Sequence, residues 1–380
     1  MEYSDIFIPV SEHTQATYAA RSSKVFGNSI RFAVKEFEWA WLQGFKVALI
    51  GLRRQGSPNS FPPLREAFYS LYQPTKGVDI IDLGDVEMAG PGCGEKVEFA
   101  LYKLLEQGVF PLVFSESMRY SYLLYCALKA YQKTAAASYI LSAANLGAVH
   151  EPLSDDNFLA HALVDYGKEL SHLSVLGYQS YLTSPDDIRQ LTALYCETLR
   201  LGLIRDENRL AEPLLRDADM LCAAVSAVRQ SDAPAATEAS PNGFYAEEMC
   251  RLLRFAGFSD KMKGFYLGGF NLTRDVNSQT AKLLAQMIWH VVDGIAHRVN
   301  EYPGDEAKSC RRLQVELGEQ QDQQLVFYQS KITDRWWIEV PIDGSDRKQL
   351  IACLKEDYDQ ASHFEIPDRW LWFLKKSTLC

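Results

Sequence analysis

The sequence predicts an α/β protein whose core is a parallel β-sheet, and two observations support this fold class. Short apolar runs bounded by turn residues are typical of buried strands, and they occur at residues 46–52, 78–84, 109–115, 137–143 and 220–228. Segments with apolar residues at helical spacing lie between most of these runs. Strands that alternate with helices form a parallel sheet that is covered by helices on both faces.

Helical segments accompany these strands along the chain. They are predicted at residues 64–72, 96–108, 121–133, 186–203, 246–258 and 279–299. The last segment is the most regular, because its apolar residues recur on one face. Gly108 and Gly257 stand where glycine commonly ends a helix.

The pattern changes near residue 300, so we expect an α/β domain over residues 1–300 and an aromatic-rich C-terminal extension over residues 301–380. A segment rich in Pro, Gly and charge separates the two. Two β-like runs follow, at 325–330 and 335–340, and short helical pieces come after them. This content predicts a small α+β extension.

Composition excludes several classes of protein. A formal net charge of -10 opposes contact with phosphate backbones, so nucleic acid is not an expected partner. No run approaches the roughly 20 apolar residues that a membrane helix needs, and the N-terminus lacks a signal segment. The eight cysteines are scattered without a C-x-x-C pair, which favours reduced thiols over a zinc site or a disulfide framework. We therefore expect a cytoplasmic protein without membrane insertion.

Several segments between about residues 40 and 300 carry landmarks in a defined order. VALIGLRRQGSPNSFPPLREAF reads as a strand, a glycine-bearing loop and a helix, and VDIIDLGDV carries the D-x-G-D element of Asp82, Gly84 and Asp85. GEKVEFALYKLLEQGVFPLVFSES and KGFYLGGFNLTRDVNSQTAKLLAQMIWHVVDG supply later helices and strands. Together they resemble the ureohydrolase family of arginases, agmatinases and formimidoylglutamases. The resemblance implies a three-layer α/β/α fold with a parallel sheet of about eight strands, and a homo-oligomer.

The resemblance also implies where two manganese ions would sit, held by GG-x-H, D-x-H-x-D and D-x-D motifs at the carboxyl ends of strands. The corresponding positions carry thioether, methyl and hydroxyl groups, none of which holds a hard divalent ion well. No Asp or Glu occurs in residues 134–150 or 221–231. We expect no cofactor and no catalytic residue. The ligand positions are replaced by Met118, Ala143, Ala144, Ala224 and Ser226.

Another D-x-D pair, Asp217 and Asp219, lies at the start of the strand at 220–228. Ligands of parallel α/β sheets bind beyond the opposite, carboxyl ends of the strands. A solvated turn is therefore the better interpretation of this pair than a metal site.

Some residues still match the family's substrate pocket. Glu248 matches a glutamate of the substrate loop and Asn271 a common asparagine, whereas Gly269 stands where the family carries a glutamate. With Ser115 and Asn145 they form a possible remnant of the pocket.

The extension holds four of the seven tryptophans, and two of the four directly follow an arginine. Tryptophan and arginine concentrate at interface hot spots, which predicts a possible partner surface. Alternatively, these aromatics attach the extension to the α/β domain. The residues are Arg335, Trp336, Trp337, Arg369, Trp370 and Trp372.

Three functional hypotheses follow. The leading one is a catalytically inactive ureohydrolase-fold protein that binds or scaffolds an unknown protein partner in the cytoplasm. The second is an active hydrolase of C–N bonds in a guanidino or formimino substrate, which would need manganese. The third is a sensor that binds an amino-acid-like small molecule in the old substrate pocket.

Overall fold

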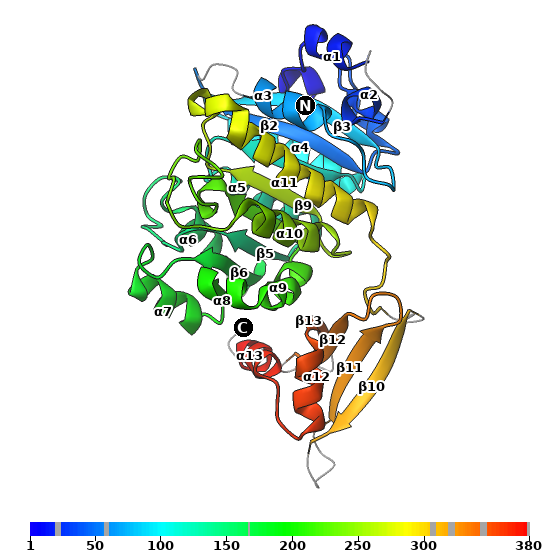
Figure 1. Cartoon of the computed structure of the whole chain (residues 1–380), viewed down its shortest axis with the longest axis vertical. Coiled ribbons are helices and arrows are strands. Elements are labelled where there is room, and N and C mark those ends of the chain that lie inside the picture. Colours follow the sequence, from blue (N-terminus) through cyan, green and yellow to red (C-terminus); the bar gives the residue numbers. More distant parts are fainter. Residues whose placement is uncertain are drawn as a thin grey trace.

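The computed structural model describes residues 1–19, 24–56, 61–165, 168–304, 309–317, 324–342 and 348–377. It consists of an α/β body and a smaller C-terminal module (Figure 1). The body is built on a parallel sheet of nine strands in the order β1-β3-β2-β4-β9-β8-β5-β6-β7. These strands are β1 (Arg31–Phe32), β2 (Val47–Arg54), β3 (Ile80–Met88), β4 (Phe110–Ser115), β5 (Ala135–Ile140), β6 (Leu170–Tyr178), β7 (Glu197–Arg200), β8 (Met220–Ala224) and β9 (Gly264–Gly268).

Helices cover both faces of this sheet, which gives the three layers that the sequence predicts. One face is covered by α3 (Pro62–Tyr69), α8 (Leu201–Asp206), α9 (Ala211–Asp217), α10 (Ala246–Gly257) and α11 (Gln279–Ala296). The other is covered by α4 (Cys93–Glu106), α5 (Ser121–Gln132), α6 (Phe158–Leu163) and α7 (Pro185–Ala193). Short elements complete the body: α1 (Glu12–Ala19), α2 (Phe26–Ser29) and the 3-10 turns Tyr3–Asp5, Trp39–Leu42, Asn208–Leu210, Val225–Ala227, Leu272–Arg274 and Val276–Ser278.

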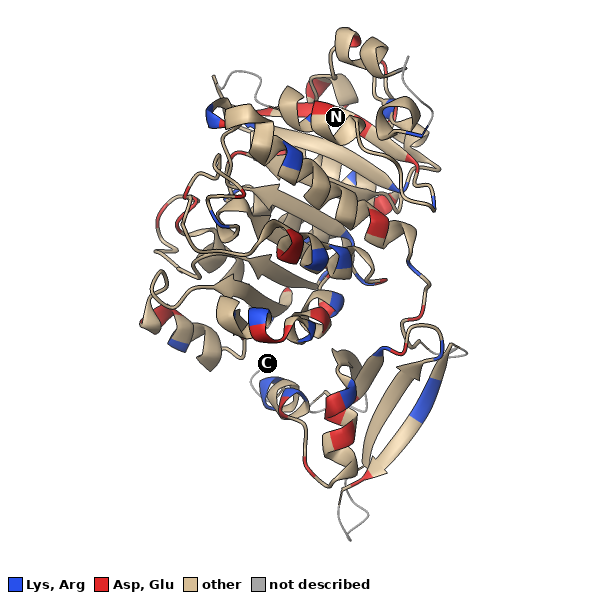
Figure 2. Cartoon of the chain, in the orientation of Figure 1, with Lys and Arg blue, Asp and Glu red and all other residues tan. Residues whose placement is uncertain are grey.

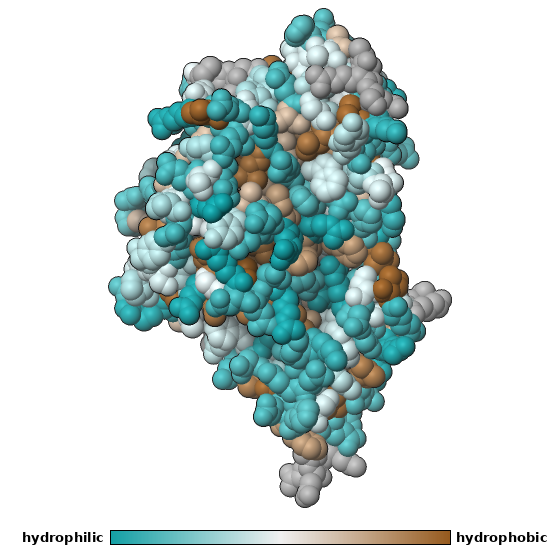
Figure 3. All heavy atoms as spheres, viewed as in Figure 1, coloured by the Kyte–Doolittle hydropathy of each residue, from teal (hydrophilic) through white to brown (hydrophobic). Residues whose placement is uncertain are grey.

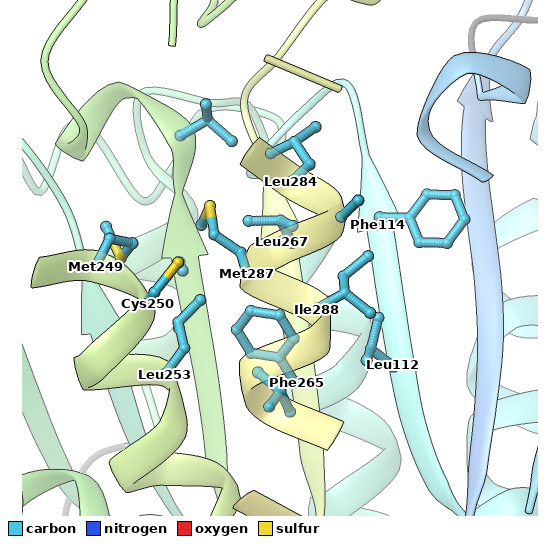
Figure 4. Close-up of a cluster of buried hydrophobic side chains, with 14 of the residues drawn as sticks. Leu112, Phe114, Met249, Cys250, Leu253, Phe265, Leu267, Leu284, Met287 and Ile288 are labelled. Carbon is cyan, nitrogen blue, oxygen red and sulfur yellow. The ribbon is translucent and has the colours of Figure 1, made fainter. Parts of the chain in front are cut away.

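The apolar runs form the central strands because helices cover both faces of the sheet, so that side chains on both sides of a strand are buried. Every residue of β4 and β5 is buried. On one face, Leu253 of α10 and Met287 and Ile288 of α11 pack over Phe265 and Leu112 of the sheet (Figure 4). Each such buried side chain contributes roughly 1.5–3 kcal/mol. Within the described segments, no helix combines the length and apolar character that crossing a bilayer requires.

The single helix predicted at 186–203 is wrong. α7 ends at Ala193, and Tyr195 adopts a φ of 53°, a left-handed conformation that cannot continue a helix. The next residues form β7, which pairs with β6, and α8 then starts at Leu201. The apolar residues of the segment are therefore divided between three elements.

The C-terminal module is a four-stranded antiparallel sheet with two helices, which confirms the predicted α+β extension. Its elements are β10 (Cys310–Glu316), β11 (Gln324–Ser330), β12 (Trp336–Pro341), β13 (Lys348–Cys353), α12 (Lys355–Ser362) and α13 (Asp368–Ser377). Phe327, Ile338, Ile351 and Phe373 form a core between sheet and helices. The module lies at the β6 end of the large sheet (Figure 1), where Arg369 of α13 pairs with Glu197 of β7.

Candidate functional site

The carboxyl ends of four neighbouring strands, β4, β9, β8 and β5, meet at one edge of the sheet. The residues that follow these strands are close together. A Cβ added at Gly268 would lie 2.9 Å from Sδ of Met118, and one at Gly269 would lie 4.0 Å from the backbone nitrogen of Val225. Oγ of Ser142 lies 3.2 Å from Oγ of Ser226. The positions that the resemblance assigns to the three metal motifs are therefore neighbours in space.

The side chains at this edge are packed against one another. Met118, Ala144 and Ala224 are buried in one apolar cluster. The ring of Tyr266 is fully buried in the same cluster, and its hydroxyl donates to the carbonyl oxygen of Ser117. Burial raises the pKa of this phenol well above its ordinary value, so it remains a neutral donor.

The donor groups around this edge do not fit a manganese pair. In the described parts of the chain, no three His, Cys, Asp or Glu side chains come close enough together to hold a metal ion. The carboxylate of Asp155 accepts hydrogen bonds from Oγ of Ser117 at 2.7 Å and from the backbone N–H of Arg119 at 3.0 Å. This acid organises the loop after β4.

The residues of the possible remnant pocket form hydrogen bonds with backbone groups. Oγ of Ser115 is buried and donates to the carbonyl of Leu52 at 2.9 Å. Oδ1 of Asn271 caps the short turn that follows it. Asn145 is exposed. In the described part of the chain, the side chains of Ser115, Asn145, Glu248 and Asn271 form no hydrogen bond with one another.

Glu248 lies at the start of α10, where its carboxylate accepts from the backbone N–H of Tyr245 at 2.8 Å and from Nε of Arg205 at 3.3 Å. A cavity of about 200 Å³ beside it is lined by Arg205, Arg251 and Phe244, but by none of the other three predicted pocket residues. A shared pocket of all four residues stays a prediction.

The D-x-G-D element forms a buried ion-pair network. Arg65 of α3 donates from Nε to Asp82 at 2.8 Å and from Nη1 to Asp85 at 2.7 Å. The hydroxyl of Tyr69 adds a bond to Asp82 at 2.6 Å. Gly84 has a φ of 86°, and a Cβ there would lie 2.1 Å from the carbonyl oxygen of Ile8. The element therefore joins β3, α3 and the N-terminal segment, and sequence reasoning did not identify Arg65 as its partner.

One acid of the second D-x-D pair, Asp217, connects the body to the module, and the other, Asp219, has its partners within the body. Asp217 accepts from the backbone N–H of Ala352 at 2.8 Å and from Nη2 of Arg369 at 2.6 Å. Asp219 accepts from the backbone N–H of Ala136 at 2.8 Å and pairs with Lys263 at 3.0 Å. Both carboxylates are buried, so the predicted solvated turn is wrong. Buried carboxylates need such donors to offset their lost hydration.

Two tryptophans of the predicted partner surface lie in the interior. Trp336 and Trp337 are only 5% and 2% exposed, and the guanidinium of Arg216 stacks on the Trp337 ring at 4.4 Å. Their placement on a partner surface is therefore wrong, because alternate residues of β12 pack against the module's helices and against the body. The indole N–H groups of Trp370 and Trp372 donate to the carbonyls of Glu339 and Tyr195.

The two arginines of that set also point inward. Arg335 pairs with Glu212 at 3.2 Å and with Glu301 at 3.3 Å, and it stacks on Phe258. Arg369 bridges two carboxylates, the buried Asp217 and the partly buried Glu197. The alternative interpretation, in which these residues attach the extension to the body, describes the contacts of Arg335, Trp337, Arg369 and Trp372. Trp336 and Trp370 make their contacts within the module.

No protein-family model and no curated protein matches the sequence. Solved structures do match, and they define an arginase-type α/β fold. A formiminoglutamase of Trypanosoma cruzi, solved with Mn²⁺, has a TM-score of 0.58 at 17% identity, over 67% of this chain and 95% of its own. The formimidoylglutamase of Bacillus subtilis has a TM-score of 0.60 at 15% identity, over 78% and 93%. The agmatine ureohydrolase of Thermoplasma volcanium has a TM-score of 0.57 at 14% identity, over 74% and 98%.

This chain therefore has the arginase, or ureohydrolase, fold, as the landmarks in its sequence indicated. At these identities the likeness concerns the fold. The activity has to be argued from the site itself.

Proposed function

We propose that this protein is a catalytically inactive member of the ureohydrolase fold that acts as a cytoplasmic binding or scaffolding protein, and that it forms homo-oligomers. The observation that carries the proposal is the packed edge at the carboxyl ends of β4, β9, β8 and β5. Met118, Ala224 and Ser226 occupy the positions where the resemblance requires metal ligands.

The chemistry of C–N hydrolysis explains why this edge matters. The carbon of a guanidino or formimino group is resonance-stabilised, and at neutral pH its hydrolysis needs a nucleophile stronger than water, such as a metal-bridging hydroxide. Manganese sites are built from carboxylate and imidazole ligands. The thioether of Met118 and the methyl group of Ala224 offer neither, and both are buried among apolar neighbours.

The test is the metal content of the protein, measured by mass spectrometry after purification without chelator from manganese-supplemented cells. A ureohydrolase of known activity, purified in parallel, is the positive control. We expect far less than one manganese per chain. About two per chain would overturn the proposal and favour an active hydrolase whose ligands lie elsewhere in the sequence.

A binding role is supported by the way in which the module is attached. Ion pairs and buried aromatic rings fix it to the β7 end of the sheet, away from the packed edge. On the face shown in Figure 3, hydrophobic residues are scattered among hydrophilic ones and form no single broad patch. The junction between body and module is therefore where we look for a binding site.

A further inference from the structure

A cleft of about 490 Å³ lies between the body and the module. Its body wall is formed by β7, with Thr198 and Leu199, and by Leu214 of α9. Its module wall is formed by α12, with Asp357, and by α13, with Trp372. Cavities of this size and mixed lining commonly bind ligands in proteins.

The body wall of the cleft is the free edge of a sheet. β7 is the last strand in the order, and within the part of the chain that the structure describes it pairs only with β6. Glu197, Thr198 and Leu199 all line the cleft, although the side chains of consecutive strand residues point to opposite faces. What these three residues have in common is their place on the edge of β7, so we infer that the backbone edge of this strand faces the cleft. The N–H and C=O groups on that edge can pair with another extended chain.

The cleft is acidic around an apolar floor. Among its described lining residues, four are acids and Arg369 is the one base. The charge of Arg369 is taken up by Glu197 and Asp217. Within the described segments, Asp357 and Asp368 have no ion pair. The acidic residues of α12 are coloured red on the ribbon in Figure 2. Burial raises the pKa of Asp357, and the nearby guanidinium of Arg369 opposes this rise only in part.

We propose that this cleft binds an extended, basic and apolar segment of a partner protein, which adds as a strand to the free edge of β7. Its basic side chains lie beside Asp357 and Asp368, and an apolar side chain lies between Leu214 and Trp372. A peptide fits better than a small organic cation, because only a peptide supplies backbone donors and acceptors to the strand edge. The inference rests on the proposed binding function and names its site.

The experiment uses the full chain and a fluorescein-labelled, N-acetylated peptide of three Lys-Val repeats, with binding followed by fluorescence anisotropy. Leu199→Arg should abolish binding, because it places a cation on the cleft floor. Asp357→Asn should weaken binding about threefold to tenfold, and its polar side chain can still cap α12. The matched controls are Asp359→Asn on the same helix and Leu203→Arg on α8, which lie outside the cleft lining and should bind like wild type.

A second peptide, N-methylated at alternate residues, tests the strand pairing itself. Its missing N–H groups should weaken binding roughly tenfold or more. Equal affinity for both peptides, or binding of hexylamine in place of the peptide, would overturn the strand addition. If no peptide binds while the protein is free of manganese, this inference fails and the proposed inactivity stands. Stoichiometric manganese would remove the proposed function itself.

Discussion

Arg369→Met should weaken the attachment of the module by about 3 kcal/mol. The guanidinium donates to Glu197 at 2.5 Å, to Asp217 at 2.6 Å and to the carbonyl of Ala352 at 2.8 Å. Methionine keeps an apolar stem but removes the cation between two carboxylates that are only 14% and 6% exposed. Removal of one partner from a buried ion pair costs roughly 3–5 kcal/mol. The backbone donor that remains on Asp217 favours the lower end.

The assay is urea denaturation followed by tryptophan fluorescence, since four of the seven tryptophans lie in the module. Hydrogen exchange at the amide of Ala352, which donates to Asp217, reports the opening of the junction directly. Arg209→Met is the matched control. Arg209 also forms an ion pair across the junction, with Glu356, but the two side chains are 56% and 46% exposed, so its loss should change the midpoint little.

Equal urea midpoints for the two arginine variants would refute the reasoning. So would unchanged exchange at Ala352, because the carboxylates of Glu197 and Asp217 would then be solvated in the folded state. In that case aromatic packing alone would stabilise the junction, and the ion pairs would contribute nothing to it.

The remaining predictions concern pH and packing. Burial lowers the pKa of His172 to about 4, so the unfolded chain takes up a proton first and stability should fall as pH drops from about 6.5 to about 4. His172→Gln should flatten this part of a urea-midpoint profile, and an unchanged slope would assign it to other groups. Trp337→Ala should cost roughly 3–5 kcal/mol in thermal melts, whereas the half-exposed Trp41→Ala should cost little; equal losses would contradict the packing role.

Most residues of the strands that sequence reasoning found are apolar. β4 and β5 are buried throughout and read as continuous apolar runs. β6 was missed because it carries His172 and Ser174 inside the sheet. These are satisfied by partners distant in sequence, Glu197 at 2.8 Å and Ser138 at 2.5 Å. The sequence alone does not show that these polar residues have partners in the fold. The pattern of β6 is therefore not typical of a buried strand.

The candidate site was predictable in part. The absence of acids after β5 and β8 is visible in the sequence, whereas the packing that fills their edge is not. Tyr266 comes from β9 and bonds to Ser117 after β4, a pairing across 149 residues. The tryptophan and arginine residues of the module can also be seen in the sequence. Their composition does not distinguish an internal junction from an external partner surface. The acidic partners of Arg369, Glu197 and Asp217, are more than 150 residues away.

The packed edge depends on backbone positions as well as on missing ligands. A Cβ added at Gly268 would lie 2.9 Å from Sδ of Met118 and 3.0 Å from the carbonyl oxygen of Ser117. The first contact can be relieved by a rotation of the flexible methionine, but the second requires the backbone after β4 to move. That backbone is held by Tyr266 and by Asp155. A side chain at position 268 would therefore require the loop after β4 to move, so Gly268 and the packing of this edge depend on one another.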